Sequence, residues 1–173
     1  MNPVEEFAYR SHPHLFVTIG GILMIIQIVF AIFLFNWSGS STIANVGWVI
    51  LWTAGFFGVM PIITFRRKGG VPKKKSYMHT TKLVDTGVYA VARHPQNGVA
   101  WVLISLGVML VAQNWPVVLA GFGSMVFAYL DLYKEEQRCI DKFGDEYKQY
   151  MKKVPRINFL LGLIRVIKRR KNE

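Results

Sequence analysis

Long apolar stretches alternate with short polar segments along this chain, and the apolar stretches have the lengths of membrane-spanning helices. Residues 15–35 and 46–65 contain no charged side chain. A stretch of about 20 apolar residues crosses a hydrocarbon layer of about 30 Å as a helix. Two more apolar stretches, 97–112 and 115–133, are separated by only two polar residues and predict a helical hairpin. The pattern predicts an all-α integral membrane protein with four transmembrane helices.

Lysine and arginine are confined to three segments, and their placement predicts the orientation in the membrane. Of the 21 basic residues, Arg10 precedes the first span, eight lie within 66–93, and the other twelve follow residue 133. Residues 36–45 and 113–114 contain none. Because cytoplasmic loops carry the excess of lysine and arginine, we expect both termini and all three basic segments to be cytoplasmic.

The composition agrees with a membrane protein and argues against binding of nucleic acid. The chain is 52% hydrophobic and has a formal net charge of +11. Its basic residues lie beside apolar spans, so they indicate anionic lipid headgroups as the partner and not a nucleic acid. The first span is too long for the apolar core of a signal peptide, and we expect a retained anchor. The single Cys139 excludes an internal disulfide and a multi-cysteine metal cluster.

Two basic segments are suited to a membrane surface. Residues 66–75 (RRKGGVPKKK) predict a cationic loop that sets the topology or, alternatively, contacts phospholipid. Residues 158–171 are apolar and then strongly basic, which predicts a C-terminal cytoplasmic amphipathic helix at the interface, or alternatively a lid. We expect a single membrane domain over residues 1–173, with an interfacial tail at 157–173. Glycines in the spans are expected to allow close helix contact: Gly55, Gly58, Gly121 and Gly123.

The stretch GVYAVARHPQNG, residues 87–98, stands directly before the third apolar stretch and carries candidate chemistry. Pro95 has no N–H to lose and suits the first turn of a helix. Arg93 and His94 would flank the positive end of that helix, where backbone donors and a guanidinium favour a carboxylate or phosphate. Just upstream lie a glycine that permits close backbone approach and an aromatic ring, Gly87 and Tyr89. A plain interfacial anchor is the alternative interpretation.

A second candidate region follows the fourth span. Its apolar residues recur at helical spacing and trace one face: Ile140, Phe143, Tyr147, Tyr150 and Met151. The same face extends backward to Glu136, whereas Glu135 lies about 100° away, so Glu136 is expected to point inward. Carboxylates here and cations before the third span would together suit a zwitterion. An ordinary surface pair between Glu135 and Arg138 is the alternative.

The segments TGVYAVARHPQ (86–96) and KEEQRCIDKFGDEYKQYMKKVPR (134–156) resemble the isoprenylcysteine carboxyl methyltransferase and phospholipid methyltransferase superfamily of integral membrane enzymes. The resemblance covers residues 83–156 and implies S-adenosylmethionine bound at the cytoplasmic face. The cofactor contacts that it implies near the Arg-His-Pro motif are Gly87, Val88, Tyr89, Arg93, His94, Pro95 and Asn97. It also implies that Glu135 and Glu136 hold the amino group, and that Tyr147, Tyr150 and Pro155 wall the adenosine pocket. Asn97 departs from the family, which commonly has tyrosine there.

Methyl transfer from a sulfonium is an in-line displacement, in which alignment supplies most of what a protein contributes. The residues we expect to be catalytic are Glu136, Arg138 and His94. A carboxylate acceptor would be oriented by Arg138 or Arg156, and an amine or thiol would need a base, His94 or Glu136. The acceptor is expected to be membrane-embedded or lipophilic: an isoprenylcysteine carboxylate, a phospholipid amine or a thiol.

Two other functions fit parts of the sequence. Membrane sterol reductases, which use NADPH, have a similar Arg-His-Pro element and a tail similar to residues 138–155, but they are usually longer and have more spans. A non-catalytic lipid-binding membrane protein would use the basic segments alone. Binding of S-adenosylhomocysteine or of NADPH separates these functions. The sequence leaves the oligomeric state open.

Overall fold

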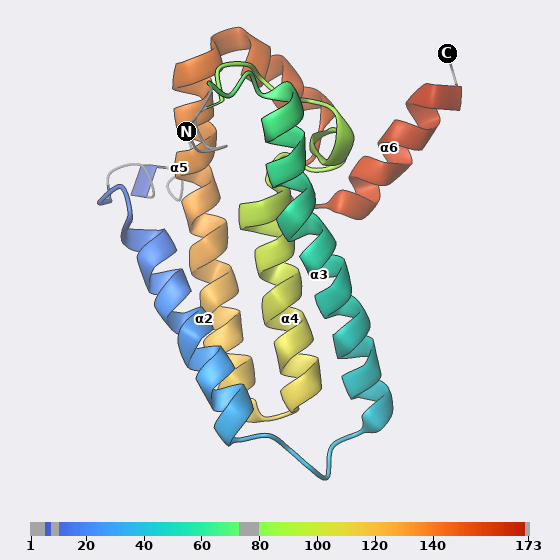
Figure 1. Cartoon of the computed structure of the whole chain (residues 1–173). Helices are drawn as coiled ribbons and strands as arrows, with labels where there is room; N and C mark the ends of the chain where they lie inside the picture. The colour runs from blue at the N-terminus through green and yellow to red at the C-terminus, as the bar shows by residue number, and fades with distance from the viewer. Residues whose placement is uncertain (1–5, 8–10, 73–79, 172–173) are drawn as a thin grey trace. The chain divides into compact units, whose positions relative to one another are not determined.

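The regular elements of this protein are helices in the computed structural model, which describes residues 6–7, 11–72 and 80–171. No strand occurs along these residues, so the predicted all-α class is confirmed. The elements, shown in Figure 1, are α2 (Leu15–Phe33), α3 (Ser41–Lys68), a 3₁₀ turn η1 (Gly87–Ala90), a π-helical turn η2 (Pro95–Ala100), α4 (Trp101–Ala112), α5 (Trp115–Lys153) and α6 (Phe159–Lys171). Arg10 and the lysines of the expected cationic loop, Lys73 to Lys75, lie outside the described residues.

Among the described residues, four helices are long and apolar enough to cross a membrane, as predicted: α2, α3, the segment Pro95–Ala112, and α5. These findings support an integral membrane protein. The helix bounds differ from the predicted spans because an apolar stretch marks what enters the hydrocarbon layer and not where helical hydrogen bonding ends. α5 has 39 residues, so the chain stays largely helical far beyond the apolar part, 115–133. The cytoplasmic position of the termini stays a prediction.

The chain forms two compact units, and each is described by itself. Unit 1 comprises Met1–Gly55 and Ala100–Glu136, and unit 2 comprises Phe56–Val99 and Gln137–Glu173. Both α3 and α5 contribute residues to the two units. The prediction of a single membrane domain stays a prediction.

Unit 1 combines apolar helices with a few polar contacts inside them. The Gln27 amide is fully buried on α2 and donates to the Ser105 carbonyl oxygen of α4 at 2.8 Å. Ser124 of α5 donates to the Gly20 carbonyl oxygen of α2 at 2.9 Å, and the Trp101 indole donates to the Ser124 hydroxyl oxygen at 2.9 Å. Hydrogen bonds between helices, made by polar side chains, are typical of membrane proteins, where the surroundings offer no water.

Helices α3 and α4 of unit 1 approach each other closely at two glycines. A Cβ atom built on Gly47 would lie 2.9 Å from the Gly107 carbonyl oxygen, and one built on Gly107 would lie 3.0 Å from the Gly47 carbonyl oxygen. Gly121 is also tightly packed, as expected, with Gln27 and Met109 against it. A Cβ built on Gly55 or Gly58 would meet nothing within 4 Å in this chain, so their part in close helix contact stays a prediction. Spacing alone cannot tell which side of a helix faces a neighbour.

The turn of the helical hairpin is also a tertiary anchor. Gln113 has left-handed backbone dihedrals, with φ of 48°, and ends α4. Its side chain accepts from the Ser40 N–H at 2.9 Å and donates to the Ser40 carbonyl oxygen at 2.8 Å. Asn36 donates through its side chain to the Gln113 carbonyl oxygen, and Asn114 donates in the same way to that of Leu34. The hairpin is confirmed, and its two polar residues fasten the loop between α2 and α3.

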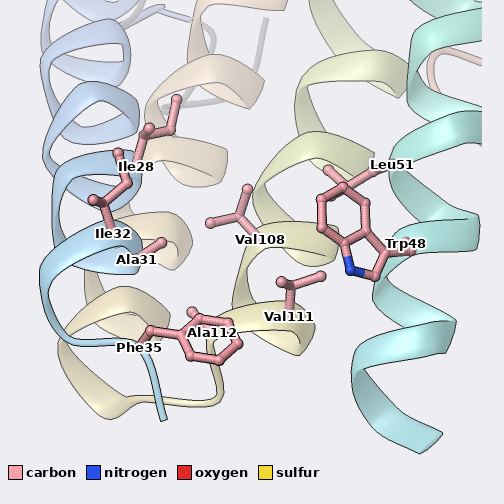
Figure 2. Close-up of a pocket in the computed structure, with 9 residues that line it drawn as sticks. All are labelled: Ile28, Ala31, Ile32, Phe35, Trp48, Leu51, Val108, Val111 and Ala112. Atoms are coloured by element: carbon pink, nitrogen blue, oxygen red, sulfur yellow. The ribbon is translucent and has the colours of Figure 1, made fainter. Parts of the chain in front are cut away.

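A cavity of about 170 Å³ lies between α2, α3 and α4 of unit 1. Figure 2 shows that its lining is aliphatic and aromatic. The residues are Ile28, Ala31, Ile32, Phe35, Trp48, Leu51, Val108, Val111 and Ala112. No lining residue is charged, so this cavity suits hydrocarbon and offers nothing that would hold a zwitterionic cofactor.

Candidate cofactor-binding site

The loop before the third span is fixed onto α3 by aromatic packing within unit 2. Gly87 begins η1 with φ of +64°, a conformation that L side chains rarely adopt. The turn buries Val88 and Tyr89 against Met60 and Phe65 of α3. The Tyr89 ring stacks on that of Phe65, with centroids 4.6 Å apart and an interplanar angle of 18°. The aromatic face of Tyr89 is therefore covered by Phe65 on one side.

The Arg-His-Pro motif is hydrogen-bonded to the segment that follows α5. The Arg93 N–H donates to the Pro155 carbonyl oxygen at 3.0 Å, and the His94 N–H donates to that of Arg156 at 3.1 Å. His94 is 7% exposed and Arg93 is half-buried. The structure thus joins the two segments that carry the resemblance, which are about 60 residues apart in sequence. They are joined through backbone groups, which do not depend on side-chain identity.

Tyr150 adds a third connection between these segments. Its hydroxyl donates to the Tyr89 carbonyl oxygen at 2.6 Å. The residue lies beyond the apolar part of α5, and burial raises the pKa of its phenol above the ordinary value. The phenol therefore keeps its proton and remains a donor. Its role here is to hold the loop, which leaves it unsuited to proton transfer.

The third span begins with a π-helical turn and not with an α-helical one. The His94 carbonyl oxygen accepts from the N–H groups of Gly98 at 3.0 Å and Val99 at 2.9 Å. Pro95 lies in the first turn of this helical segment, as expected, and its side chain is fully buried. The helical segment therefore starts at Pro95, two residues before the predicted bound. Asn97, in the position where the family commonly has tyrosine, is exposed on this turn, and its contact with a cofactor stays a prediction.

The predicted face after residue 134 exists, although the helix that carries it is broken. Gly144 has φ of 58° and ψ of −131°, which interrupts α5. Residues on both sides of the break still join one cluster, with Tyr147, Tyr150 and Val154 at its centre and Leu83, Cys139, Ile140, Phe143 and Met151 around them. The Tyr147 and Tyr150 rings lie 5.7 Å apart. The predicted tyrosine wall is thus part of a packed cluster in unit 2.

The two glutamates differ in burial as their positions on the helix predict. Glu136 is 4% exposed, whereas Glu135 is half-buried. Both belong to unit 1, so their contact with a cofactor stays a prediction. Arg138 is exposed and belongs to unit 2. Its expected catalytic role also stays a prediction.

Lys134 is a buried residue that the sequence does not reveal. It is 6% exposed, and its ammonium donates to the carbonyl oxygens of Ser11, at 3.0 Å, and His12. The ammonium also lies over the Phe16 ring, 4.9 Å from the centroid. Helical geometry puts Lys134 about 160° away from Glu136, which predicts exposure. It is buried because the chain that enters α2 covers this side of α5, a tertiary contact that periodicity cannot indicate.

Comparison with known proteins adds a partial similarity. The chain is 39% identical over 87 residues to the protein-S-isoprenylcysteine O-methyltransferase of Xenopus laevis, which covers 49% of this chain and 29% of that protein. This similarity supports a membrane methyltransferase. The chain spans less than a third of the relative's length. No family model matches the chain, and no solved structure matches it.

Proposed function

We propose that this protein transfers a methyl group from S-adenosylmethionine to a membrane-embedded or lipophilic acceptor. The observation that carries the proposal is the pair of backbone hydrogen bonds from Arg93 and His94 to Pro155 and Arg156. They join the two motif segments at the start of a membrane-spanning helix. The similarity to a protein-S-isoprenylcysteine O-methyltransferase supports the same reaction class.

The residues of unit 2 fit a zwitterionic nucleoside. Arg93 supplies a cation and His94 a nearly buried imidazole, and both stand before the N-terminal end of a helix, where a carboxylate is favoured. From the resemblance we propose Tyr147 and Tyr150, whose rings are packed in the unit 2 cluster, as the aromatic wall of the adenosine pocket. From the resemblance we also propose Gly87, Val88, Tyr89, Pro95, Asn97 and Pro155 as cofactor contacts, and Glu135 and Glu136 as partners of the amino group.

When bound, the cofactor supplies an electrophilic methyl group on a sulfonium. The contribution of the protein is to align the acceptor with that methyl group and to exclude water. For a carboxylate acceptor, Arg156 is the better of the two candidate cations, because its backbone is bonded to His94 while Arg138 is exposed. For an amine or a thiol, His94 or Glu136 would take the proton.

Cofactor binding is tested by titrating the purified protein with S-adenosylhomocysteine. We expect His94→Ala to weaken binding roughly tenfold, the loss of about 1.4 kcal/mol of side-chain contact. The backbone bonds of His94 should survive this substitution, but loss of a side chain that is 7% exposed also leaves a cavity, so binding is measured well below the melting temperature of the variant. Lys152→Ala, at an exposed position of α5, is the matched control and should bind as the unaltered protein does. Glu136→Gln, compared with Glu135→Gln, tests the proposed contact with the amino group.

The reaction is tested by methyl transfer in bilayers, with labelled S-adenosylmethionine and either an isoprenylated cysteine compound or a total membrane lipid extract. Labelled product from either acceptor supports the proposal and identifies the acceptor class. Binding of NADPH without binding of S-adenosylhomocysteine would replace the proposal with a reductase. Binding of neither would leave a non-catalytic lipid-binding protein.

A further inference from the structure

The C-terminal helix α6 has one side that is docked in unit 2 and an opposite side that is apolar and open. On the docked side, Gly162 is so close to the loop before the third span that an added Cβ would lie 1.7 Å from the Val91 carbonyl oxygen. Arg165 and Arg169 donate to the Lys153 carbonyl oxygen at the end of α5, at 3.4 Å and 2.7 Å. These contacts fix which side of α6 faces away from the rest of unit 2.

The open side of α6 consists of large aliphatic side chains. Relative to Gly162, helical geometry puts Leu160, Leu163, Ile164 and Ile167 between about 100° and 200° around the helix. They are 61%, 47%, 50% and 56% exposed, respectively. Four neighbouring side chains of this size form a contiguous apolar face of the kind that marks a site of interaction.

The start of α6 is level with the middle of a membrane span. The Phe159 ring, at the first residue of α6, packs on that of Phe57 in α3, with centroids 5.1 Å apart. Phe57 lies near the centre of the apolar stretch 46–65 and nine residues before Arg66. Nine helical residues correspond to about 13 Å, which is close to half of a hydrocarbon layer of about 30 Å.

The basic end of α6 matches the basic end of α3. Lys168 follows Phe159 by nine residues, as Arg66 follows Phe57, and each starts a basic cluster: Arg66, Arg67 and Lys68 in α3, and Lys168, Arg169, Arg170 and Lys171 in α6. In Figure 1, α6 (red) begins beside α3 and runs away from it toward the C-terminus. A helix of 13 residues is about 20 Å long, which is enough to rise from mid-span to headgroup level at a slant.

We infer that α6 is inserted obliquely into the bilayer, with its first turn near the middle of the hydrocarbon layer and its last turn among anionic lipid headgroups. The partner of its open face is lipid: acyl chains along Leu160, Leu163, Ile164 and Ile167, and headgroup phosphates at Lys168 to Lys171. The neighbouring part of α3 agrees, since Phe56 and Val59 are 52% and 53% exposed in the same unit. Arg165 sits at the depth where a charge is costly, and its bond to a carbonyl oxygen supplies a partner.

Depth measurements by spin labelling test this inference. Cys139→Ala removes the single cysteine, and labelled cysteines are then introduced one at a time at Leu160, Ile164, Ile167 and Lys171, with Val59 of α3 as the internal depth standard. The protein is reconstituted in vesicles of phosphatidylcholine and phosphatidylglycerol. Collision of each label with oxygen, which partitions into lipid, is compared with collision with a water-soluble nickel complex. Melting temperature and elution volume establish that each variant is folded.

The expected result is a graded depth, with the label at Leu160 as deep as that at Val59 and each later label shallower, so that Lys171 is at headgroup level. Equal, shallow depths at all four positions would mean a helix lying flat at the interface, which overturns the inference. High nickel accessibility at Leu160 would put the helix in water and also overturn it. Low accessibility to both reagents would mean that a protein, such as a second copy of this chain, covers the face, which overturns lipid as its partner.

Discussion

The contacts inside unit 1 differ in kind from the contacts inside unit 2. In unit 1 the contacts between helices are made by small residues, such as Gly47 and Gly107, and by a few isolated side-chain hydrogen bonds such as that of Gln27. In unit 2, segments far apart in sequence are joined backbone to backbone, at Arg93 and His94, and are packed with aromatic rings. Close packing suits helices whose partners are lipid and other helices. Backbone bonding suits a site, because it fixes the geometry of the loop whatever side chains the loop carries.

If close backbone approach stabilises unit 1, filling the space between α3 and α4 should have the largest effect of all. Gly107→Leu puts a side chain where Leu51 and the Gly47 carbonyl oxygen already lie, and we expect a loss of about 3 kcal/mol in the free energy of unfolding. Thermal unfolding in detergent, followed by tryptophan fluorescence, measures it. Gly55→Leu, where a Cβ meets nothing within 4 Å, is the control and should unfold near the normal temperature. Equal unfolding of the two variants would contradict this account of unit 1.

The corresponding test in unit 2 fills the close contact between α6 and the loop before the third span. Gly162→Ala forces α6 away from the Val91 carbonyl oxygen, and we expect a local cost of about 2 kcal/mol. Such a cost raises the population with α6 undocked about 30-fold. Limited digestion with trypsin should therefore cut the basic end of α6 much faster than in the unaltered protein. Gly58→Ala, in open space within the same unit, should be digested at the normal rate, and equal rates would show that the contact is unimportant.

Removing the hydrogen bond of Tyr150 tests the loop of unit 2 separately from unit 1, because this bond acts on loop geometry alone. Tyr150→Phe leaves the buried Tyr89 carbonyl oxygen without this donor, which should cost about 1 to 2 kcal/mol. Amide hydrogen exchange should accelerate across residues 88–94 and stay unchanged in unit 1. Because burial raises the pKa of Tyr150, the stability it contributes is fully present below the ordinary pKa of tyrosine. The difference in stability should therefore be constant between about pH 6 and pH 9, and a difference that changed within this range would contradict this account.

The smallest difference is expected between two variants at the hairpin turn of unit 1. Gln113→Ala removes both bonds to Ser40 and keeps the unfavourable φ of 48°, for a loss of about 1 to 2 kcal/mol. Gln113→Gly removes the same bonds but relieves the backbone, so it should be less destabilising than Ala by about 0.5 to 1 kcal/mol. Thermal unfolding of the pair measures the difference. A glycine variant no more stable than the alanine variant would mean that the left-handed conformation carries no cost here.

The apolar stretches predicted the spans and the hairpin because hydrocarbon thickness imposes a length that the sequence must meet. The inward position of Glu136 was predictable for a similar reason, since a helical face of Ile140, Phe143 and Tyr147 leads back to it. The length of an apolar stretch and the spacing along a helical face are both properties of the local sequence. Neither requires knowledge of which segments pack together in the fold.

Features decided by contact between distant segments were not predictable. The helical pattern predicts that Lys134 is exposed to solvent. In the structure it is buried, and its ammonium donates to the carbonyl oxygens of Ser11 and His12. The packing glycines Gly47 and Gly107 carry no sign that separates them from Gly55 and Gly58. The hydrogen bonds from the Arg-His-Pro motif to Pro155 and Arg156 were not predictable, because backbone groups carry no sequence signature.

The π-helical turn at Pro95 fixes the rotational phase of the third span. A turn closed from Val99 to the His94 carbonyl oxygen holds one more residue than an α-turn does. Deleting that one residue would restore α-helical spacing, and every later side chain of the helix would then be rotated by about 100° relative to the loop. Ser105 would turn away from Gln27. A single surplus residue thus sets which side of α4 carries Ser105, and a one-residue deletion here should be far less tolerated than a substitution.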